Sequence, residues 1–191
     1  MTPEVLEEIS TLVRAAFYPK GIIMEILCEE MYEPGELDPD AVSQRIDAEI
    51  QKLLAEQKSW PAQTDCDRLD TVFAALNERG IVALQNAGYM QDDGYDEVWE
   101  AYPDAADDER TVGYCFYHGQ DLERAVRGGG LYLAFGPVEP ENEATKGPAV
   151  GRIVRQELER VGFQVEWDGT FKQRILVPKL DWKRRLSEEL I

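Results

Sequence analysis

Residues 65–84 read DCDRLDTVFAALNERGIVAL, and this stretch decides the fold class. Its first fifteen residues predict a helix with an apolar stripe made of Leu69, Val72, Phe73 and Leu76. Gly80 follows as the glycine that commonly ends a helix. The next four residues, 81–84, are all apolar, which is typical of a strand buried on both faces of a sheet. A helix followed by such a strand indicates an α/β protein.

The same alternation continues to the end of the chain. The pattern predicts further strands at 111–117, 131–135, 163–167 and 174–177, and further helices at 92–102, 120–127 and 148–161. Residues 62–191 are therefore expected to form an α/β domain with a mixed sheet of about five strands flanked by helices. An α+β two-layer sandwich is the alternative architecture.

Upstream of this domain, residues 1–61 are expected to form an acidic segment of three helices. The first begins after Thr2 as N-cap with Pro3 at its first position, and the third begins in the same way at Asp38 and Pro39. A shorter helix is predicted between them, near residues 22–31. The connector SWPA at 59–62 marks the boundary.

Charge is distributed unevenly along the 191 residues, whose net charge is -18. Residues 1–61 hold 13 acids and 5 bases, residues 62–110 hold 13 and 3, and residues 111–191 hold 12 of each. An acidic surface repels phosphate, so nucleic acid is not an expected partner, and a helix-turn-helix interpretation of the first three helices is disfavoured. A basic protein partner is favoured instead, although acidity also serves solubility alone.

Composition excludes several classes of protein. The longest apolar runs, of about four to six residues, are far shorter than the ~20 that cross a bilayer, and the N-terminus lacks the pattern of a signal peptide. Cys28, Cys66 and Cys115 are odd in number and lack CxxC spacing, so neither a disulfide framework nor a zinc site is expected. We therefore expect no membrane association and a cytoplasmic location.

The densest polar cluster, YCFYHGQD, covers residues 114–121. It lies where a strand ends and a helix begins, which is where clefts open in α/β sheets. His118 is the only histidine, and it is the candidate catalytic acid–base group, with Asp121 as the group that orients it. Asn86 and Gln120 are the candidate ligand-binding residues. The alternative is a structural role, with His118 hydrogen-bonded and Asp121 capping the helix.

The predicted strand directions bear on this site. If the strands at 81–84 and 131–135 both run parallel to the strand at 111–117, Asn86, His118 and Gly136 meet at one edge of the sheet. Alternation along a strand puts Cys115 and His118 on opposite faces, so a nucleophilic pair of these two is disfavoured.

No motif indicates a cofactor or a metal. The glycines at 128–130 follow a helix, whereas phosphate loops precede one, and the run 146–152 lacks nucleotide-binding spacing although it opens a helix. The acidic run 92–97 fails the spacing of a calcium loop. We expect neither a cofactor nor a metal site.

Several segments resemble one family. These are GYCFYHGQDLERAV at 113–126, GGGLYLAF at 128–135, and ALNERGIVALQNAGY at 75–89, with VEWDG after them. They are similar to an uncharacterised bacterial family, a domain of unknown function. The resemblance implies a bacterial cytoplasmic origin and one architecture across the family, and it implies no activity.

Two classes of function follow from these features. The first is a non-enzymatic binding or regulatory protein, for example an inhibitor or immunity-like protein, whose acidic surface engages a cationic protein. The second is a small-molecule enzyme or ligand-binding domain with a pocket around His118. Whether the chain is an enzyme stays open at this point.

Overall fold

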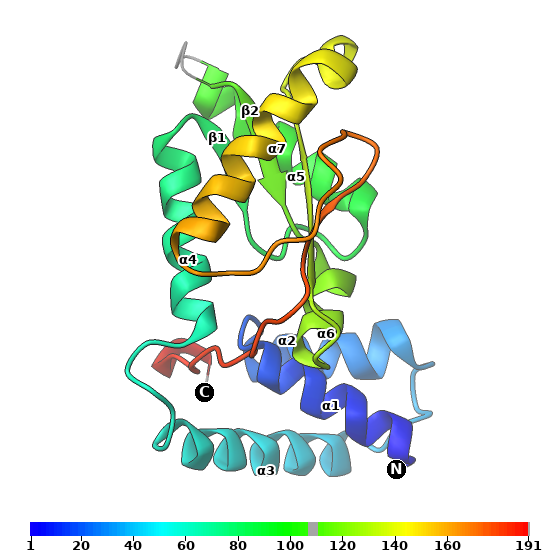
Figure 1. Cartoon of the computed structure of the whole chain (residues 1–191). Coiled ribbons are helices and arrows are strands. Elements are labelled where there is room, and N and C mark those ends of the chain that lie inside the picture. The colour runs from blue at the N-terminus through cyan, green and yellow to red at the C-terminus, as the bar shows by residue number, and fades with distance from the viewer. Residues whose placement is uncertain (107–110, 191) are drawn as a thin grey trace. The chain divides into compact units, whose positions relative to one another are not determined.

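A computed structural model of the chain describes residues 1–106 and 111–190 (Figure 1). The chain divides into two compact units. The helical unit contains Met1–Thr64 and Trp182–Ile191, and the α/β unit contains Asp65–Asp181. Among the described residues, no helix combines the length and the apolarity that a bilayer crossing requires.

The helical unit contains α1 (Pro3–Ala15), α2 (Lys20–Glu25), a π-helical turn (Ile26–Met31) and α3 (Pro39–Gln57). Both predicted N-caps are confirmed, because the Thr2 side chain accepts a hydrogen bond from the amide of Val5, and that of Asp38 from the amide of Asp40. Its core is a single apolar cluster, which includes Val5, Ile9, Leu12, Ile23, Leu27, Ile46 and Leu53.

The last ten residues belong to the helical unit. The Trp182 indole donates a hydrogen bond to the carbonyl of Arg14 (3.1 Å), and the amide of Leu186 donates one to the Gln57 side chain (2.8 Å). The Arg184 guanidinium lies 4.5 Å from the ring centroid of Phe17. The sequence pattern assigns these residues to the α/β domain, whereas in the structure their hydrogen bonds and ring contacts group them with the helices.

The α/β unit alternates helices and strands. Its helices are α4 (Asp65–Glu78), α5 (Gln91–Ala106), α6 (Gly119–Val126) and α7 (Glu143–Arg160); its strands are β1 (Ile81–Leu84), β2 (Gly113–Phe116), β3 (Leu131–Gly136) and β4 (Ile175–Val177). Short 3-10 turns lie at Pro140–Asn142 and, in the helical unit, at Glu188–Leu190. The α/β fold with a mixed sheet flanked by helices is confirmed.

The sheet has the order β1-β2-β3-β4, with β1 parallel to β2 and the two remaining pairs antiparallel. Helices α4 and α7 contact each other, and they pack against β1 and β3 respectively (Figure 1). On the other face, α5 contributes Val98 and Tyr95 to an apolar cluster with Val82, Tyr114 and Phe116. Helices therefore cover both faces, which explains why β2 is buried throughout.

The prediction of about five strands is wrong, because the described residues form four. Residues 163–167 make one isolated bridge, in which Glu166 and Leu176 exchange both backbone hydrogen bonds (2.8 and 3.0 Å). The next hydrogen-bonded pair of this antiparallel register joins Gln164 to Pro178. Since proline has no amide hydrogen to donate, the ladder does not continue on the side of Gln164, and residues 163–167 keep a single bridge.

The condition for the predicted grouping, that β3 runs parallel to β2, is not met. Figure 1 shows α6 beyond the end of β2 rather than alongside the sheet, so the chain returns as an antiparallel strand. In this register Gly136 lies opposite Tyr114, at the beginning of β2. Gly136 is therefore at the far end of β2 from His118, and the predicted grouping of Asn86, His118 and Gly136 does not form.

Helix α7 begins at Glu143, five residues before the predicted start at Pro148. Proline is tolerated near a helix start because the first amides have no partner inside the helix. Here it occupies the sixth position and removes one internal hydrogen bond. Because the residues before it are mostly compatible with a helix, the helix extends upstream of the proline.

The open edge of the sheet is closed by a side chain. The Asn77 amide nitrogen donates to the carbonyl of Ala83 (3.2 Å), and the Asn77 oxygen accepts from the amide of Ala83 (3.0 Å). These are the two backbone groups that an additional strand would pair with. The C-terminal turn of α4 therefore takes the place of a neighbouring strand beside β1.

Candidate functional site

A cavity of about 700 Å³ opens in the α/β unit between α5, β3 and the loop that precedes β4. This volume is in the range of small-molecule sites. The walls are formed by Gln91, Tyr95, Tyr132, Ala134, Phe135, Phe171, Lys172, Gln173 and Arg174. We call this cavity the α5–β3 pocket.

The α5–β3 pocket has a charge opposite to that of the chain. Among the described residues that line it, Lys172 and Arg174 are charged and none is an Asp or Glu. The whole chain, by contrast, carries a net charge of -18. Lys172 is exposed and forms no ion pair with the residues that the structure describes. The pocket is therefore locally cationic and favours an anion.

Arg174 is held in place from behind. Its Nη1 donates to Oδ2 of Asp121 at 2.8 Å, and the Asp121 side chain is only 4% exposed. The guanidinium also lies 4.9 Å from the ring centroid of Tyr132, at cation–π distance. A buried carboxylate and an aromatic face fix one side of this arginine. Its remaining N–H groups are available to a ligand, because a guanidinium carries five donors.

His118 completes the group behind Arg174. Its Nε2 lies 3.0 Å from Oδ2 of Asp121 and 3.3 Å from Nη1 of Arg174. With a proton on Nε2, His118 donates to the carboxylate, because arginine has no acceptor; in the other tautomer Nε2 accepts from Nη1 of Arg174. We call Asp121, His118 and Arg174 the buried triad.

Burial controls the protonation of the triad. Loss of hydration lowers the pKa of His118 from its ordinary value of 6.5, although the charge of Asp121 acts in the opposite direction. Loss of hydration also raises the pKa of Asp121 from its ordinary value of 3.8, although Arg174 opposes that shift. The lowered pKa favours the neutral form of His118, whereas Arg174 keeps its charge and is the permanent cation beside Asp121.

The structure brings together two of the four predicted site residues. His118 and Asp121 are in contact, as predicted, but they reach the α5–β3 pocket only through Arg174 and do not line it. Asn86 adopts a left-handed φ of 54° in the turn after β1, and the exposed Gln120 uses its backbone amide to bond the carbonyl of Tyr89. Neither side chain lines the pocket.

Cys115 is excluded from solvent chemistry. It is fully buried in β2, where its neighbours in register are Ala83 and Phe135. Burial raises the pKa of its thiol far above the ordinary value, so the reactive thiolate does not form. The described residues also contain no group of three His, Cys, Asp or Glu side chains placed to hold a metal ion.

The lining residues Lys172 and Arg174 were not predicted as site residues. They belong to the run FKQR at 171–174, which follows the turn at Gly169. Two cations beside an aromatic residue in a loop were the available signal. The pattern did not identify Arg174 because its carboxylate partner, Asp121, lies 53 residues away in the sequence.

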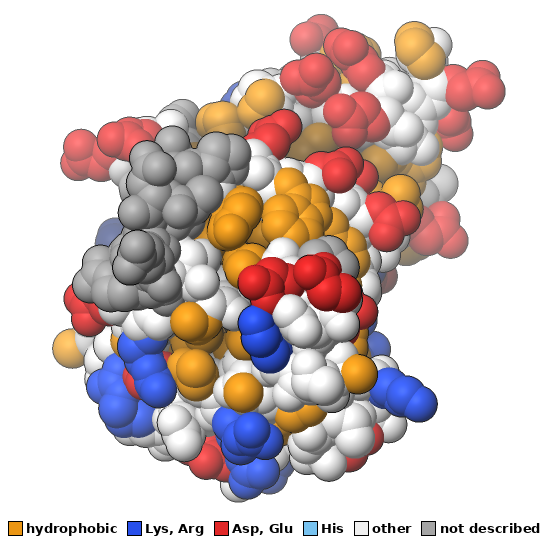
Figure 2. Space-filling model, turned by 90° about the horizontal axis from the view of Figure 1, so that it is seen from above, with side chains coloured by type: hydrophobic (Ala, Val, Ile, Leu, Met, Phe, Trp, Pro, Cys, Tyr) orange, Lys and Arg blue, Asp and Glu red, His pale blue; other side chains and the backbone are white. Residues whose placement is uncertain are grey.

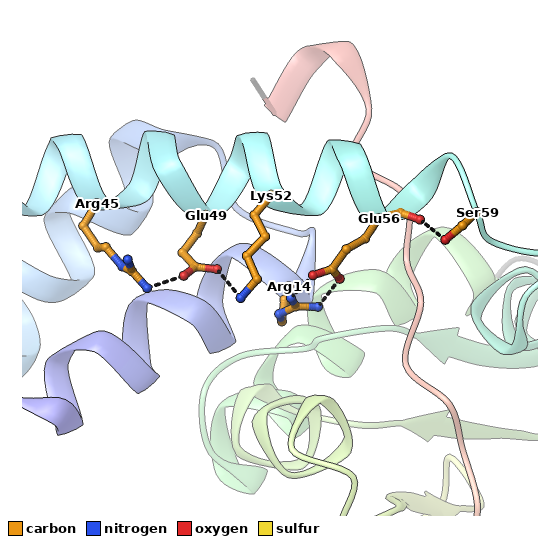
Figure 3. Close-up of polar contacts among 6 residues, drawn as sticks. All are labelled: Arg14, Arg45, Glu49, Lys52, Glu56 and Ser59. Atoms are coloured by element: carbon orange, nitrogen blue, oxygen red, sulfur yellow. Dashed lines mark hydrogen bonds and ion pairs between the residues drawn. The ribbon is translucent and has the colours of Figure 1, made fainter.

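A second buried polar cluster lies in the helical unit, between α1 and α3 (Figure 3). The Glu49 side chain, 4% exposed, contacts Arg45 and lies 3.8 Å from Lys52 on the same helix. Arg14 bonds both carboxylate oxygens of Glu56, at 2.9 and 2.8 Å. Of these pairs, Arg14–Glu56 joins α1 to α3.

A family model described as "Domain of unknown function (DUF6891)" matches residues 1–186, and the chain belongs to this family. The resemblance inferred from its sequence segments is confirmed at the level of the family. Comparison with curated proteins and with solved structures gives no match. The description of the family names no activity, so the function has to be argued from the site itself.

Proposed function

We propose that the α/β unit of this DUF6891 family member is a binding domain for a small organic anion. The observation that carries the proposal is the sign of the charge at the α5–β3 pocket: Lys172 and Arg174 line its walls, the described lining residues include no acid, and the one carboxylate paired with Arg174, Asp121, lies behind it. In a chain with a net charge of -18, such a reversal is not explained by solubility.

The buried triad supports the same function. A guanidinium binds carboxylate or phosphate best when it is already oriented, because less conformational entropy is then lost on binding. Asp121 and Tyr132 hold Arg174 in this way. We assign His118 and Asp121 as positioning residues for Arg174. The earlier hypothesis of His118 as a catalytic acid–base group is kept as the alternative, in which a bound ligand receives or loses a proton at this edge of the pocket.

The proposal is tested by titrating the purified chain, at low salt, with pairs of ligands that differ in charge alone. Calorimetry with benzoate and benzamide, and with cyclohexanecarboxylate and its amide, makes the comparison. At least one acid is expected to bind, and to bind more tightly than its amide. Arg174→Gln should abolish the difference, whereas Arg152→Gln, an exposed site on α7, should retain it. Equal binding of acids and amides, or no binding of either, overturns the proposal.

A second candidate function concerns the helical unit, for which a cationic protein partner is proposed. Glu25, Glu29 and Glu30 are exposed and form no ion pair with the described residues. Ile22 and Met31 nearby in the sequence are each 41% exposed. Figure 2 shows the face seen from above the view of Figure 1, where acidic side chains are exposed among apolar and basic ones. Acidic and apolar groups together suit a basic amphipathic segment.

This second candidate predicts an association that weakens as salt rises. The probe is a synthetic amphipathic helix built from lysine and leucine. The triple variant with Gln at positions 25, 29 and 30 should bind it several-fold more weakly than wild type. The control carries Asp92→Asn, Asp96→Asn and Glu100→Gln, which remove the same charge from exposed sites on α5. Equal binding by the two triple variants contradicts a docking site on the helical unit.

A further inference from the structure

We propose that the ligand of the α5–β3 pocket is a planar aromatic acid, whose ring lies against the aromatic walls and whose carboxylate or phosphate meets Lys172 and Arg174. This inference rests on the anion-binding function proposed above and names the chemical class of the ligand.

The walls of the pocket are mainly aromatic. Four of its nine lining residues, Tyr95, Tyr132, Phe135 and Phe171, carry rings. Phe135 is nearly buried and already stands edge-on to Phe171, with ring centroids 6.0 Å apart and an interplanar angle of 89°. Tyr95, Tyr132 and Phe171 are only partly buried, and all three line the cavity. A flat apolar ligand gains most from such walls, because rings add a geometric preference to the burial of area.

The floor of the pocket leaves space for a ring. Ala134 is the small residue between Tyr132 and Phe135 on β3, and it lines the cavity with a single methyl group. Helix α5 approaches from the side with Tyr95, whose ring packs edge-on against Tyr114 and Phe116 at 5.7 and 5.2 Å. Tyr95 is therefore fixed by the core and presents a rigid wall, which lowers the entropy lost on binding.

The charged groups of this aromatic cavity come from one loop, and a further hydrogen-bonding group comes from α5. Lys172, Gln173 and Arg174 are consecutive and all line it, so the donors arise from a single loop. On α5, the Gln91 amide nitrogen donates to the Tyr95 hydroxyl (3.0 Å), which leaves the Gln91 oxygen free to accept from a ligand. An acidic group near the loop and a ring carrying a donor near α5 match this arrangement.

The decisive probe pair is benzoate and cyclohexanecarboxylate, which share charge and approximate size but differ in planarity and aromaticity. Benzoate is expected to bind about three- to tenfold more tightly, which is the increment that aromatic pairs contribute. Phenyl phosphate measured beside benzoate separates the two sources of the anion, since tighter binding of one of them identifies phosphate or carboxylate as the natural group.

Two further measurements check that the preference for benzoate arises from the aromatic walls of the pocket. Phe171→Leu should reduce the preference for benzoate toward onefold, while Trp99→Leu, an exposed ring outside the pocket, should retain it. Because Phe171→Leu alters packing, the ligand itself is also observed, and proton NMR of bound benzoate in wild type should show upfield ring-current shifts. Equal affinity for the two acids, with no such shifts, overturns the inference and leaves the anion-binding function standing. If neither acid binds better than its amide, the proposed function fails as well.

Discussion

The two units each bury a carboxylate beside an arginine, and they use the pair differently. In the helical unit, Glu49 is enclosed by cations of its own helix, and Arg14 uses both of its Nη groups on Glu56 (Figure 3). In the α/β unit, Arg174 gives one Nη atom to Asp121 and also lines a cavity. A buried ion pair therefore does not by itself indicate a binding site. An arginine that lines a cavity and has donors left over from its ion pair does indicate one.

The pKa directions distinguish the pairs in the same way. The hydrogen bond from Arg14 lowers the pKa of Glu56, so this pair stabilises its ionised form. Burial raises the pKa of Asp121 although Arg174 acts in the opposite direction. The folded α/β unit therefore destabilises the ionised form of this carboxylate. Retaining such a group is understandable if its role is to orient an arginine rather than to stabilise the fold.

The largest expected effect comes from Arg174→Leu. This change leaves Asp121 and His118 buried without their cation, and we expect a loss of about 3 kcal/mol in the free energy of unfolding, since breaking a buried pair is costly. Urea denaturation at pH 7 measures it. Asp121→Asn, which keeps a hydrogen-bond acceptor, should cost under about 1 kcal/mol. A loss within experimental error for Arg174→Leu would contradict the arrangement of the buried triad.

A neutral contact provides the next comparison. Asn77→Ala removes both hydrogen bonds to Ala83 and exposes the edge of β1, so we expect a loss of about 1–2 kcal/mol. Hydrogen exchange should show faster opening at the amide of Ala83 than in wild type. Asn77→Asp is the informative partner, because the carboxylate keeps the acceptor for Ala83 and loses the donor. Unchanged exchange in Asn77→Ala would mean that the side chain does not close the sheet edge.

Arg14→Leu should have a smaller effect, although its pair has better geometry. Both side chains are partly exposed, at 30% and 37%, so Glu56 regains water when its partner is removed. We expect a loss of at most about 1 kcal/mol, which is the range of exposed pairs. The comparison with Arg174→Leu is made under identical conditions. If Arg14→Leu were the more damaging change, burial would not be the factor that separates the two clusters.

The smallest expected effect is on the pH dependence of the free energy of unfolding. Its sign differs between Glu56 in the helical unit and Asp121 in the α/β unit. The folded-state pKa of Glu56 is below its ordinary value of 4.5, so its contribution is present above that pH and is lost as pH falls through the folded pKa. For Asp121 the folded-state pKa is raised above 3.8, so stability falls as pH rises from that value through the folded pKa. Relative to wild type, Glu56→Gln should gain at acidic pH and Asp121→Asn should gain toward neutral pH. Denaturation curves at pH 3.5, 5 and 7 that move both variants in the same direction would refute this assignment.

Local patterns predicted much of the fold. Helix ends are marked by hydrogen bonds within a few residues, at Thr2 and Pro3, at Asp38 and Pro39, and at Gly80. Such local interactions can be predicted directly from a sequence. The uninterrupted run Ile81–Leu84 predicted a buried strand because consecutive apolar residues suit a strand covered on both faces. The fifth strand failed because its pairing depended on Pro178, which lies fourteen residues beyond Gln164 in the sequence.

The site was predicted only in part, and the reason is again distance along the chain. His118 and Asp121 are one helical turn apart, so their contact followed from the start of α6. Arg174 joins them from a loop after α7, and no periodicity connects that loop with α6. The direction of β3 mattered too, because Gly136 was expected beside His118 on the assumption of a parallel strand.

The central claim is a local anion site in an acidic chain, and one titration tests it most directly. Lys172→Gln and Lys179→Gln each remove one positive charge from an exposed lysine of the α/β unit, so they change the net charge equally, but only the first changes the α5–β3 pocket. Calorimetric titration of benzoate into both variants and wild type should show about a three- to tenfold loss of affinity for Lys172→Gln alone. Equal affinities in the two variants would contradict the claim, because the anion would then respond to overall charge and not to this pocket.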